Sequence, residues 1–496
     1  MKRIIQNRYL MLIKNLPAVF LVLFSINIIA GQAVKDSIAN PAVAEFGKYK
    51  VTFDEYKTAY LEVMKQPQMF DSKQLREDLL ENLIATKLLS VEAKKMGLDK
   101  NEQLQNRIKA YRDMCLRKAH FRHVIQPKIK VDETQVRKVY KYEKEQRRVC
   151  HLFFATESAA DSAYAIIKND TSKFNEMAKV IFSNDSALAN SGGCLGFVYW
   201  DELDYNLAMA AFTMPLNEVS KPIKSKYGYH LIKVTGYQVN PLLTEYDYQV
   251  HMYKAKLALE YQMADEYSYN YIGGMLKKAK VSVFPNIMKL VKDNLQNKFT
   301  RKPTPFNNMA ETQLNTGEIK LVENSLWDSR KDVIASINGK KYTVEDFIGE
   351  LTYVPYEVIH NDFTEAFNYA VRDFLLTDEA KKMGLGKDED VKTQTGLFSD
   401  NFIAIKLKRK LVSDVKVSED EIKKYYDDNQ KQIKGAPYNL MHPVIENQLK
   451  IDKQMNVVPQ YVNILTKNLN IKKNLNIINN YYDNLYKGNI KDKGDL

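Results

Sequence analysis

The sequence predicts an α+β protein in which an α/β domain is inserted into the first of two mainly helical modules. A seven-residue motif occurs twice, and helical patterns surround both copies. About one hundred residues rich in strand formers separate two helices of the first copy only. The chain has 496 residues, 45% hydrophobic and 27% charged, which is enough for several domains and excludes wholesale disorder. Three cysteines exclude a disulfide-stapled scaffold and a cysteine-rich zinc module.

The first 33 residues are typical of a secretory signal peptide. Four basic residues precede an uncharged apolar run over 16–30, and small residues follow at 31–33. The run is shorter than the roughly 20 residues that a membrane-spanning helix needs. We therefore predict cleavage near Ala33 rather than a retained anchor. Removal of the four basic residues lowers the formal charge from +12 to +8, and we expect an exported protein.

The remaining positive charge does not indicate nucleic-acid binding. In the densest basic cluster, residues 406–410, basic residues alternate with an apolar residue in a helical pattern. This pattern is typical of a solvent-exposed helix face. We predict no nucleic-acid partner. The charge is compatible with attraction to acidic chains or with a transient association with an anionic membrane surface.

The repeated motif predicts two copies of one helical module. Glu-Ala-Lys-Lys-Met-Gly-Leu stands at 92–98 and again at 379–385. In each copy an apolar stripe leads to the glycine, Gly97 or Gly384, which suits the position just after a helix. Both motifs therefore predict the end of a helix.

The residues upstream and downstream of the motif repeat as well. A glycine turn followed by a threonine, Thr52 or Thr343, predicts a short hairpin and then a capped helix in each copy. Downstream, residues 130–136 match 416–422, and both segments have capping-box spacing at a helix start. Three matched landmarks in one order indicate two related modules.

The two copies diverge after these helices. In the second copy a further helical run over 444–468 follows almost at once, whereas in the first a comparable run over 246–280 begins about a hundred residues later. The intervening segment must be an insert whose ends lie close together. The predicted organisation is as follows: signal peptide 1–33; module 1, 34–147 and 240–284; insert 148–239; a mostly irregular connector 285–330; module 2, 331–467; and a polar tail 468–496, which could be a frayed helix or disordered and to which we assign no function.

The insert itself has a mixed α/β pattern. Strand composition occurs at 149–155, 197–200 and 229–234. Helical periods occur at 161–168, 174–180 and 203–212, and a glycine-rich turn stands at 191–193.

The motifs of the insert, in order, resemble those of parvulin-type peptidyl-prolyl cis/trans isomerases. The resemblance is carried by Val-Cys-His-Leu-Phe-Phe at 149–154, Phe-Asn-Glu-Met-Ala at 174–178, Ser-Asn-Asp-Ser at 183–186, Gly-Gly-Cys-Leu-Gly at 192–196, Ala-Phe at 211–212, Glu-Val-Ser-Lys-Pro-Ile at 218–223 and Tyr-Gly-Tyr-His-Leu-Ile-Lys at 227–233. The flanking repeats resemble the helical chaperone portion of SurA-like exported parvulins. This resemblance implies a periplasmic location.

The resemblance also implies the site residues. His151 and His230 fall at the paired histidines of two neighbouring strands, each fixing the tautomer of the other, and Asp185 falls at the acidic or thiol position near the substrate carbonyl. The implied substrate-binding pocket is apolar and has four residues: Leu195, Leu203, Leu207 and Phe212. No metal or cofactor is implied, because rotation about an X–Pro bond needs an apolar cup and polar groups that favour the twisted amide.

Two positions depart from the family pattern. Cys194 stands where an acid usually follows the paired glycines, and Leu207 stands where an aromatic ring is usual. Leucine keeps an apolar wall but loses planar stacking against proline, so we expect weak turnover.

Simpler interpretations compete at four residues. His120 and His123 have the spacing of metal ligands, but no third ligand is evident, and surface positions are favoured. Cys150 and Cys194 could form a disulfide or redox pair. Alternation places Cys150 on the strand face opposite His151, however, and buried or reduced thiols are favoured.

Two functions remain in competition at this stage. In the first, the insert isomerises X–Pro bonds of unfolded or nascent exported and outer-membrane polypeptides while the helical modules hold them. In the second, the protein is a non-catalytic holdase with a degenerate insert. The histidine pair favours the first, whereas Leu207 and the insert-free second module favour the second. An enzyme of another class lacks support, because the sequence contains no nucleophile elbow, phosphate loop or metal-ligand cluster.

Overall fold

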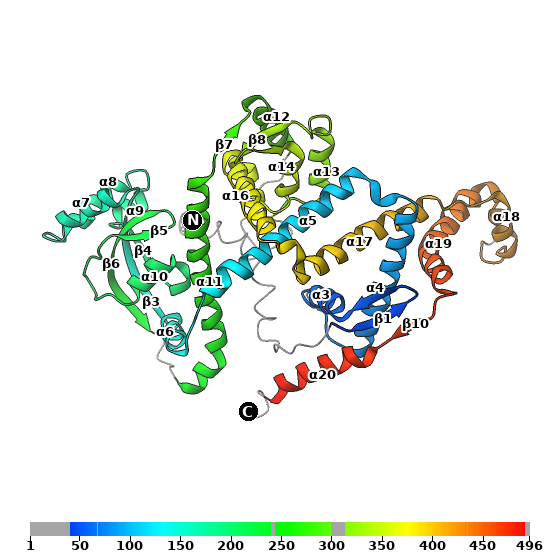
Figure 1. Ribbon diagram of the computed structural model, residues 1–496, viewed down its shortest axis with the longest axis horizontal. Helices are drawn as coiled ribbons and strands as arrows, with labels where there is room; N and C mark the ends of the chain where they lie inside the picture. Colours follow the sequence, from blue (N-terminus) through cyan, green and yellow to red (C-terminus); the bar gives the residue numbers. More distant parts are fainter. Residues whose placement is uncertain (1–39, 67, 240–243, 299–312, 434, 492–496) are drawn as a thin grey trace. The chain divides into compact units, whose positions relative to one another are not determined.

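The computed structural model describes residues 40–491 except 67, 240–243, 299–312 and 434 (Figure 1). The predicted signal peptide therefore lies outside the described residues. The described chain forms two compact units: a continuous unit, 120–379, and a split unit made of 40–119 and 380–491. No helix of the described part combines the length and hydropathy needed to cross a bilayer.

The split unit combines the start of the chain with its end. Its elements are β1 (Ala42–Phe46), β2 (Tyr49–Thr52), α3 (Phe53–Met64), α4 (Lys73–Lys95), α5 (Glu102–His120), α17 (Glu389–Ser413), α18 (Glu419–Asp428), α19 (Tyr438–Thr466), β10 (Ile471–Lys473) and α20 (Leu475–Lys491). Helices α4 and α17 pack through a buried apolar seam that includes Leu89 and Leu407. Leu407 belongs to the basic cluster at 406–410, so its basic neighbours lie beside a buried apolar contact, as the helical pattern predicts.

The continuous unit contains the insert and most of the second repeat. Its elements are α6 (Glu133–Glu143), β3 (Glu145–Phe154), α7 (Glu157–Ile167), α8 (Lys173–Ile181), α9 (Ser186–Asn190), β4 (Cys194–Val198), α10 (Tyr205–Ala211), β5 (Ile223–Ser225), β6 (Gly228–Val239), α11 (Glu245–Lys278), β7 (Val281–Val283), α12 (Pro285–Lys298), α13 (Thr316–Ser325), β8 (Val333–Ile337), β9 (Lys340–Thr343), α14 (Val344–Leu351), α15 (Tyr356–Asn361) and α16 (Phe363–Lys382). The α+β class predicted from the sequence is confirmed.

The helix caps predicted for the two repeats are present. Thr52 and Thr343 each cap a helix in a full capping box, with the side chain accepting from the third backbone N–H of the helix. Gly97 and Gly384 follow α4 and α16 with φ of 71° and 75°, a conformation that glycine adopts without steric cost. These short-range interactions depend on a few neighbouring residues, which is why the sequence specifies them.

The strand that follows each long helix pairs with the hairpin of the other repeat. Strand β7, after the helix of the first repeat, adds to β8 and β9 of the second, with Val281 opposite Ile337. Strand β10, near the end of the second repeat, adds to β1 and β2 of the first, with Phe46 opposite Ile471. Residues 240–284, which we expected to complete module 1, therefore supply the strand that completes the sheet of the second repeat. The two hairpins are closely similar, so the sequence does not distinguish the partners.

The helices that follow these strands are exchanged in the same way. Helix α12 contributes Val291 and Leu295 to the core of the second repeat. Helix α20 contributes Ile478 and Tyr482 to the core of the first. The connector predicted as mostly irregular at 285–330 thus contains α12 and α13, and the polar tail at 468–496 contains β10 and α20. The helix in the tail is one of the two alternatives left open there, whereas the irregular connector is corrected. In both segments apolar residues of the helix are buried in the core of a repeat.

The docking of α20 is reinforced by a buried arginine. Arg76 on α4 is 3% exposed and forms ion pairs with Asp71 and, at 2.6 Å, with Asp483 on α20. Its Nη1 also donates to the Asn479 side chain at 3.2 Å. A buried cation needs such compensation, so α20 satisfies a charge of the first repeat as well as its apolar core.

We expect Tyr482→Ala to destabilise the split unit strongly. Tyr482 is 2% exposed, and its ring lies 4.0 Å from that of Tyr60. Truncation of a buried aromatic side chain typically costs about 3–5 kcal/mol. Leu485→Ala on the same helix is the matched control, since Leu485 is 42% exposed and should change the unfolding free energy by less than about 0.5 kcal/mol. Equal unfolding midpoints of the two variants in urea would show that α20 is not part of this core.

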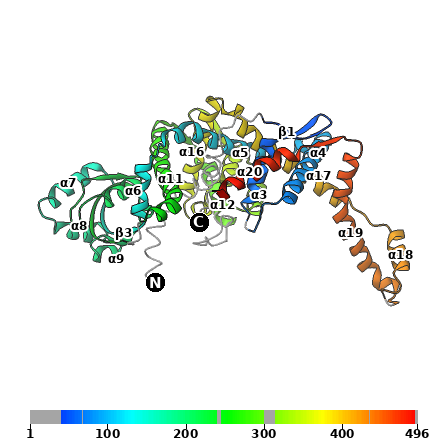
Figure 2. The same cartoon turned by 90° about the horizontal axis from the view of Figure 1, so that it is seen from below.

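The insert contains a four-stranded antiparallel sheet in the order β4-β3-β6-β5. Figure 1 labels its four strands, and Figure 2 shows the same domain from below, with α7 and α8 labelled beside the sheet. Cys150 and Leu231 pack with α7 and α8 on one face. Val149 and Ile232 pack with α6, α10 and α11 on the other. Because side chains alternate along a strand, each central strand serves both cores.

Candidate active site

The two predicted histidines lie side by side on the central strands β3 and β6. His151 is opposite Ile232, and His230 is opposite Phe153, so the histidines are diagonal neighbours on one sheet face. Their Nδ1 atoms are 3.3 Å apart, and the nearly parallel rings have centroids 5.6 Å apart. The two imidazoles are therefore within hydrogen-bonding distance of each other.

A serine that the sequence analysis did not single out fixes the outer side of the pair. Ser225 Oγ lies 2.9 Å from His230 Nε2 and accepts the backbone N–H of Tyr227 at 3.0 Å. We assign the serine proton to the bond with Nε2, which leaves His230 with a proton on Nδ1 to donate to His151 Nδ1. The sequence offered one indication of this contact: Ser225 stands only five residues before His230, and the short β5–β6 hairpin between them brings the two side chains together.

Burial keeps both imidazoles neutral. It lowers the pKa of His151 to about 4, and burial together with repulsion from His151 lowers the pKa of His230 to about 3. His151 Nε2 is buried without a hydrogen-bond partner among the described residues. A neutral pair in apolar surroundings can hold a fixed tautomer, but it cannot serve as a cationic acid near neutral pH.

These pKa shifts predict an acid-sensitive domain with a pH-independent rate near neutrality. The folded histidines bind protons less readily than the unfolded chain, whose pKa is near 6.5. Their stabilisation is therefore present above pH 6.5 and is lost as pH falls towards the folded values, by about 1.4 kcal/mol per pH unit for each histidine. We expect the urea midpoint of the insert to fall between pH 6.5 and 4, and this fall to be smaller in His151→Gln. An activity that titrates between pH 6 and 8 would contradict this assignment.

Asp185 occupies a helix terminus near the pair. It caps α9, and its Oδ1 accepts the backbone N–H groups of Ala187 and Leu188, both at 3.0 Å. Its own N–H donates to the Phe182 carbonyl at 2.8 Å, and the Phe182 ring lies 5.1 Å from that of His151. No hydrogen bond joins Asp185 to either histidine within the described part of the chain. Asp185 is connected to the site through Phe182, whose carbonyl it binds and whose ring lies near His151.

The four predicted pocket residues share one apolar cluster on the histidine face of the sheet. Leu203 and Phe212 are buried in that cluster, at 6% and 3% exposure, whereas Leu195 and Leu207 are only partly buried at its edge. The Phe212 ring lies 5.4 Å from that of Tyr142. The partly exposed leucines are thus the two that can contact a ligand directly.

Comparisons with known proteins identify two family domains in this chain. Residues 154–236 match the family model of the PPIC-type PPIase (rotamase) domain, and residues 1–137 match that of the SurA-like N-terminal domain.

Residues 154–236 are therefore a parvulin-type (PPIC) peptidyl-prolyl isomerase domain. The predicted isomerase class is thereby confirmed, together with the SurA-like character of the first helical module.

Several curated relatives match parts of this chain. Foldase protein PrsA of Caldanaerobacter subterraneus subsp. tengcongensis is 28% identical over 253 residues, which are 45% of this chain and 82% of the relative. A probable parvulin-type isomerase of Bordetella bronchiseptica is 31% identical over 171 residues, or 33% of this chain and 66% of the relative. A parvulin-like PPIase of Rickettsia bellii is 30% identical over 145 residues, 28% of this chain and 47% of the relative. The chain thus spans about half the length of some relatives and most of others.

Solved structures give matches of low overall similarity. PrsA from Bacillus anthracis has 19% identity and a TM-score of 0.22, with 40% of this chain and 96% of that chain covered. A structure from a report on two SurA-like chaperones of Campylobacter jejuni has 21% identity and a TM-score of 0.23, with 49% of this chain and all of that chain covered.

The parvulin domain contains a disulfide that the sequence analysis disfavoured. Cys150 and Cys194 are bonded, and the preference for reduced thiols is wrong. The two residues lie directly opposite each other on β3 and β4, and directly opposite residues of neighbouring strands point to the same face. Alternation does separate Cys150 from His151, but it places Cys150 beside Cys194.

The histidines outside the parvulin domain also differ from expectation in one respect. His120 is not on the surface: it is 2% exposed, and its Nε2 lies 3.3 Å from Tyr271 Oη and 3.6 Å from Glu379. His123 is exposed. Helix α5 ends at His120, and a π-helical turn, Phe121–Ile125, changes the spacing that would align the two rings. Within the described residues no group of three ligand-type side chains could hold a metal ion.

Proposed function

We propose that this protein catalyses cis/trans isomerisation of X–Pro bonds in unfolded or nascent exported polypeptides, in the periplasm, while its helical modules hold the unfolded segments. The observation that carries the proposal is the contact of His151 with His230 at the edge of a leucine-rich cluster. The parvulin family model and the foldase names of the relatives support the same class of activity.

The reaction needs no covalent step. Rotation about a peptide bond is opposed by a barrier of about 18–20 kcal/mol, because the planar amide is stabilised by conjugation. The twisted amide is less polar at oxygen, so apolar surroundings disfavour the planar form relative to it. Leu195 and Leu207 are the side chains that we assign to the proline ring. The neutral histidine pair, ordered by Ser225, forms a rigid and uncharged side of the site.

The helical modules have apolar surface for unfolded chains. Exposed large apolar side chains occur along α19, where four of them lie within one helical face: Leu440, Val444, Ile451 and Met455. Their exposed fractions range from 42% to 72%. This stripe supports a holding role independent of the parvulin domain.

The test is an isomerase assay on the full-length protein with a histidine variant and a matched control. We expect His151→Gln to lower kcat/KM by about 10²-fold, because it removes the ring that orders His230 and lines the site. His442→Gln in the split unit should leave the rate unchanged, since His442 contacts Glu419 on α18. Ser225→Ala should give an intermediate loss.

The same proteins distinguish the rival function. Leu207 and the second repeat, which has no insert, favour a non-catalytic holdase. Suppression of client aggregation by a wild-type protein without measurable isomerase activity would establish the holdase and overturn the catalytic proposal. Isomerase activity that is lost in His151→Gln, with aggregation suppression retained, would support separate catalytic and holding parts.

A further inference from the structure

The strand register slips on both sides of β3 immediately before His151. Between β3 and β4, Val149 lies opposite Gly196 but Cys150 lies opposite Cys194, so Leu195 is an additional residue on β4. Between β3 and β6, Arg148 lies opposite Gly236 but Val149 lies opposite Val234. Such bulges bend a strand and redirect its side chains. The orientation of Leu195 relative to His151 therefore depends on how the register is held at this point.

Strand β4 is an edge strand that pairs only with β3 in this sheet. The ladder between them is short, from the pair Arg147 and Val198 to the pair Cys150 and Cys194. One more backbone hydrogen bond follows, from His151 N–H to the Gly193 carbonyl at 2.9 Å. With so few pairs, β4 has few backbone hydrogen bonds to β3 that would resist a shift at the bulge.

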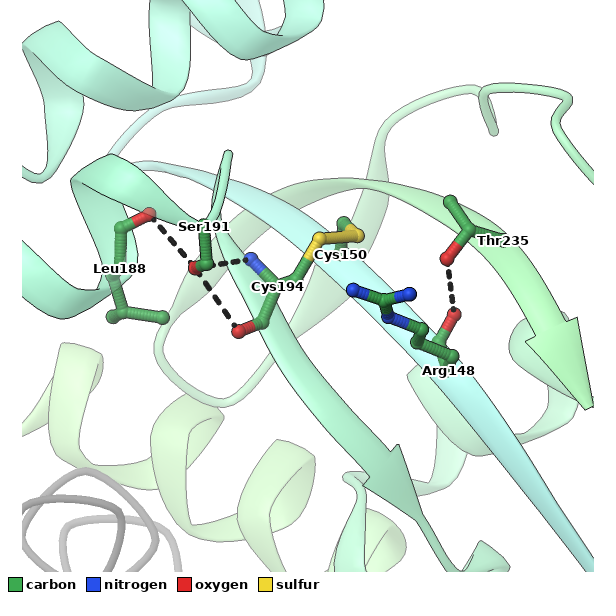
Figure 3. Close-up of a disulfide and its surroundings, with 6 residues drawn as sticks. All are labelled: Arg148, Cys150, Leu188, Ser191, Cys194 and Thr235. Carbon is green, nitrogen blue, oxygen red and sulfur yellow. Dashed lines mark hydrogen bonds between the residues drawn. A yellow bond between two sulfur atoms is a disulfide. The ribbon is translucent and has the colours of Figure 1, made fainter. Parts of the chain in front are cut away.

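The disulfide joins the pair that adjoins the bulge (Figure 3). Cys150 directly precedes His151, and Cys194 directly precedes Leu195. On the β4 side the Ser191 hydroxyl accepts the Cys194 N–H at 3.2 Å and lies 3.1 Å from the Leu188 carbonyl. The covalent bond therefore connects the backbone of a histidine of the candidate site to the backbone of a pocket leucine.

We propose that the Cys150–Cys194 disulfide is a positioning element of the isomerase site: it holds the β3–β4 register at the bulge, so that Leu195 keeps its place against the apolar cluster on the histidine face of the sheet. This inference rests on the proposed function. Neither cysteine contacts the substrate, and both act through their neighbours. Reduction lets β4 shift at the bulge and moves Leu195 out of its place against that cluster.

The chain allows this bond to be tested without mutation. It has three cysteines, and the third, Cys115, is buried in the split unit and forms no disulfide. Dithiothreitol therefore breaks one bond only. The assay must avoid a disulfide-containing coupling protease, so we choose NMR exchange spectroscopy on an Ala-Pro peptide, with the full-length protein oxidised and then reduced.

We expect reduction to lower kcat/KM by about tenfold to a hundredfold, mainly through a higher KM, because Leu195 is a binding residue. Amide spectra recorded at the same low temperature must show a folded parvulin domain, and the imidazole nitrogen signals of His151 should shift. The variant C115A should keep the full response to dithiothreitol.

A double variant separates positioning from packing. C150V/C194V keeps an apolar cross-strand pair without the bond. Its kcat/KM should equal that of the reduced protein and should not change when dithiothreitol is added. If the oxidised and reduced proteins, both folded, are equally active, or if C150V/C194V matches the oxidised protein, the positioning role is wrong and the isomerase function stands. If the oxidised protein is inactive, the proposed function itself fails.

Discussion

Replacing Gly193 with alanine is expected to eliminate isomerase activity and to unfold the β3–β4 edge of the parvulin domain. Gly193 has a φ of +76°, and a Cβ there would lie 2.3 Å from the His151 carbonyl oxygen and 3.2 Å from the Phe182 ring. The first neighbour is backbone and can move only if β4 separates from β3. Strain of about 1–3 kcal/mol from the left-handed conformation adds to this clash, so we expect a total loss above about 4 kcal/mol.

Gly339→Ala is the matched control for this substitution. Gly339 has nearly the same φ, +78°, but no atom lies within 4 Å of the position of its Cβ. It should cost only the conformational strain, in the second repeat, and leave isomerase activity intact. Both variants are measured by isomerase rate and by hydrogen exchange of the β3 and β4 amides. Retention of activity in Gly193→Ala would show that the close approach of Gly193 to His151 is unimportant for the site.

Breaking the disulfide should give the second large effect, on stability. Cys150 and Cys194 are 44 residues apart in the sequence, and the closed loop contains α7, α8 and α9. Loop-closure entropy for that length corresponds to about 4 kcal/mol at 25 °C. For a domain of this size the midpoint of thermal unfolding should then fall by roughly 15 °C or more.

The measurement is thermal unfolding of the full-length protein, followed by the signals of the parvulin domain before and after reduction. Tyr482→Ala serves for comparison, because it should destabilise the split unit and leave this transition in place. An unfolding midpoint that does not change on reduction would contradict this prediction. It would mean that the unfolded chain is already so compact that the disulfide hardly lowers its conformational entropy.

Local features could be predicted because a few adjacent residues determine them. The capping boxes at Thr52 and Thr343, and the glycines that end α4 and α16, need only their own helix turn. The strands that carry His151 and His230 were recognisable from composition and motif order, and the family resemblance implied that the two rings pair; the β3–β6 register places them on one face.

Other parts of the site depend on register, which the sequence does not reveal. Ser225 reaches His230 because β5 folds back on β6, and the cysteines meet because a bulge adds Leu195 to β4. A shift of one residue in either pairing would reverse the faces. A sequence pattern with period two is the same before and after such a shift.

By itself, therefore, the sequence determined the class of the protein, the existence of two related modules and the residue types of an isomerase site. Only the tertiary structure decided that β7 completes the sheet of the second repeat and β10 that of the first. Two similar hairpins offer equivalent strand edges, and a three-residue strand such as β7 or β10 can add to either. The choice between them is made by the burial of α12 in the core of the second repeat and of α20 in that of the first. For α20 this joins residues about 400 positions apart, such as Arg76 and Asp483.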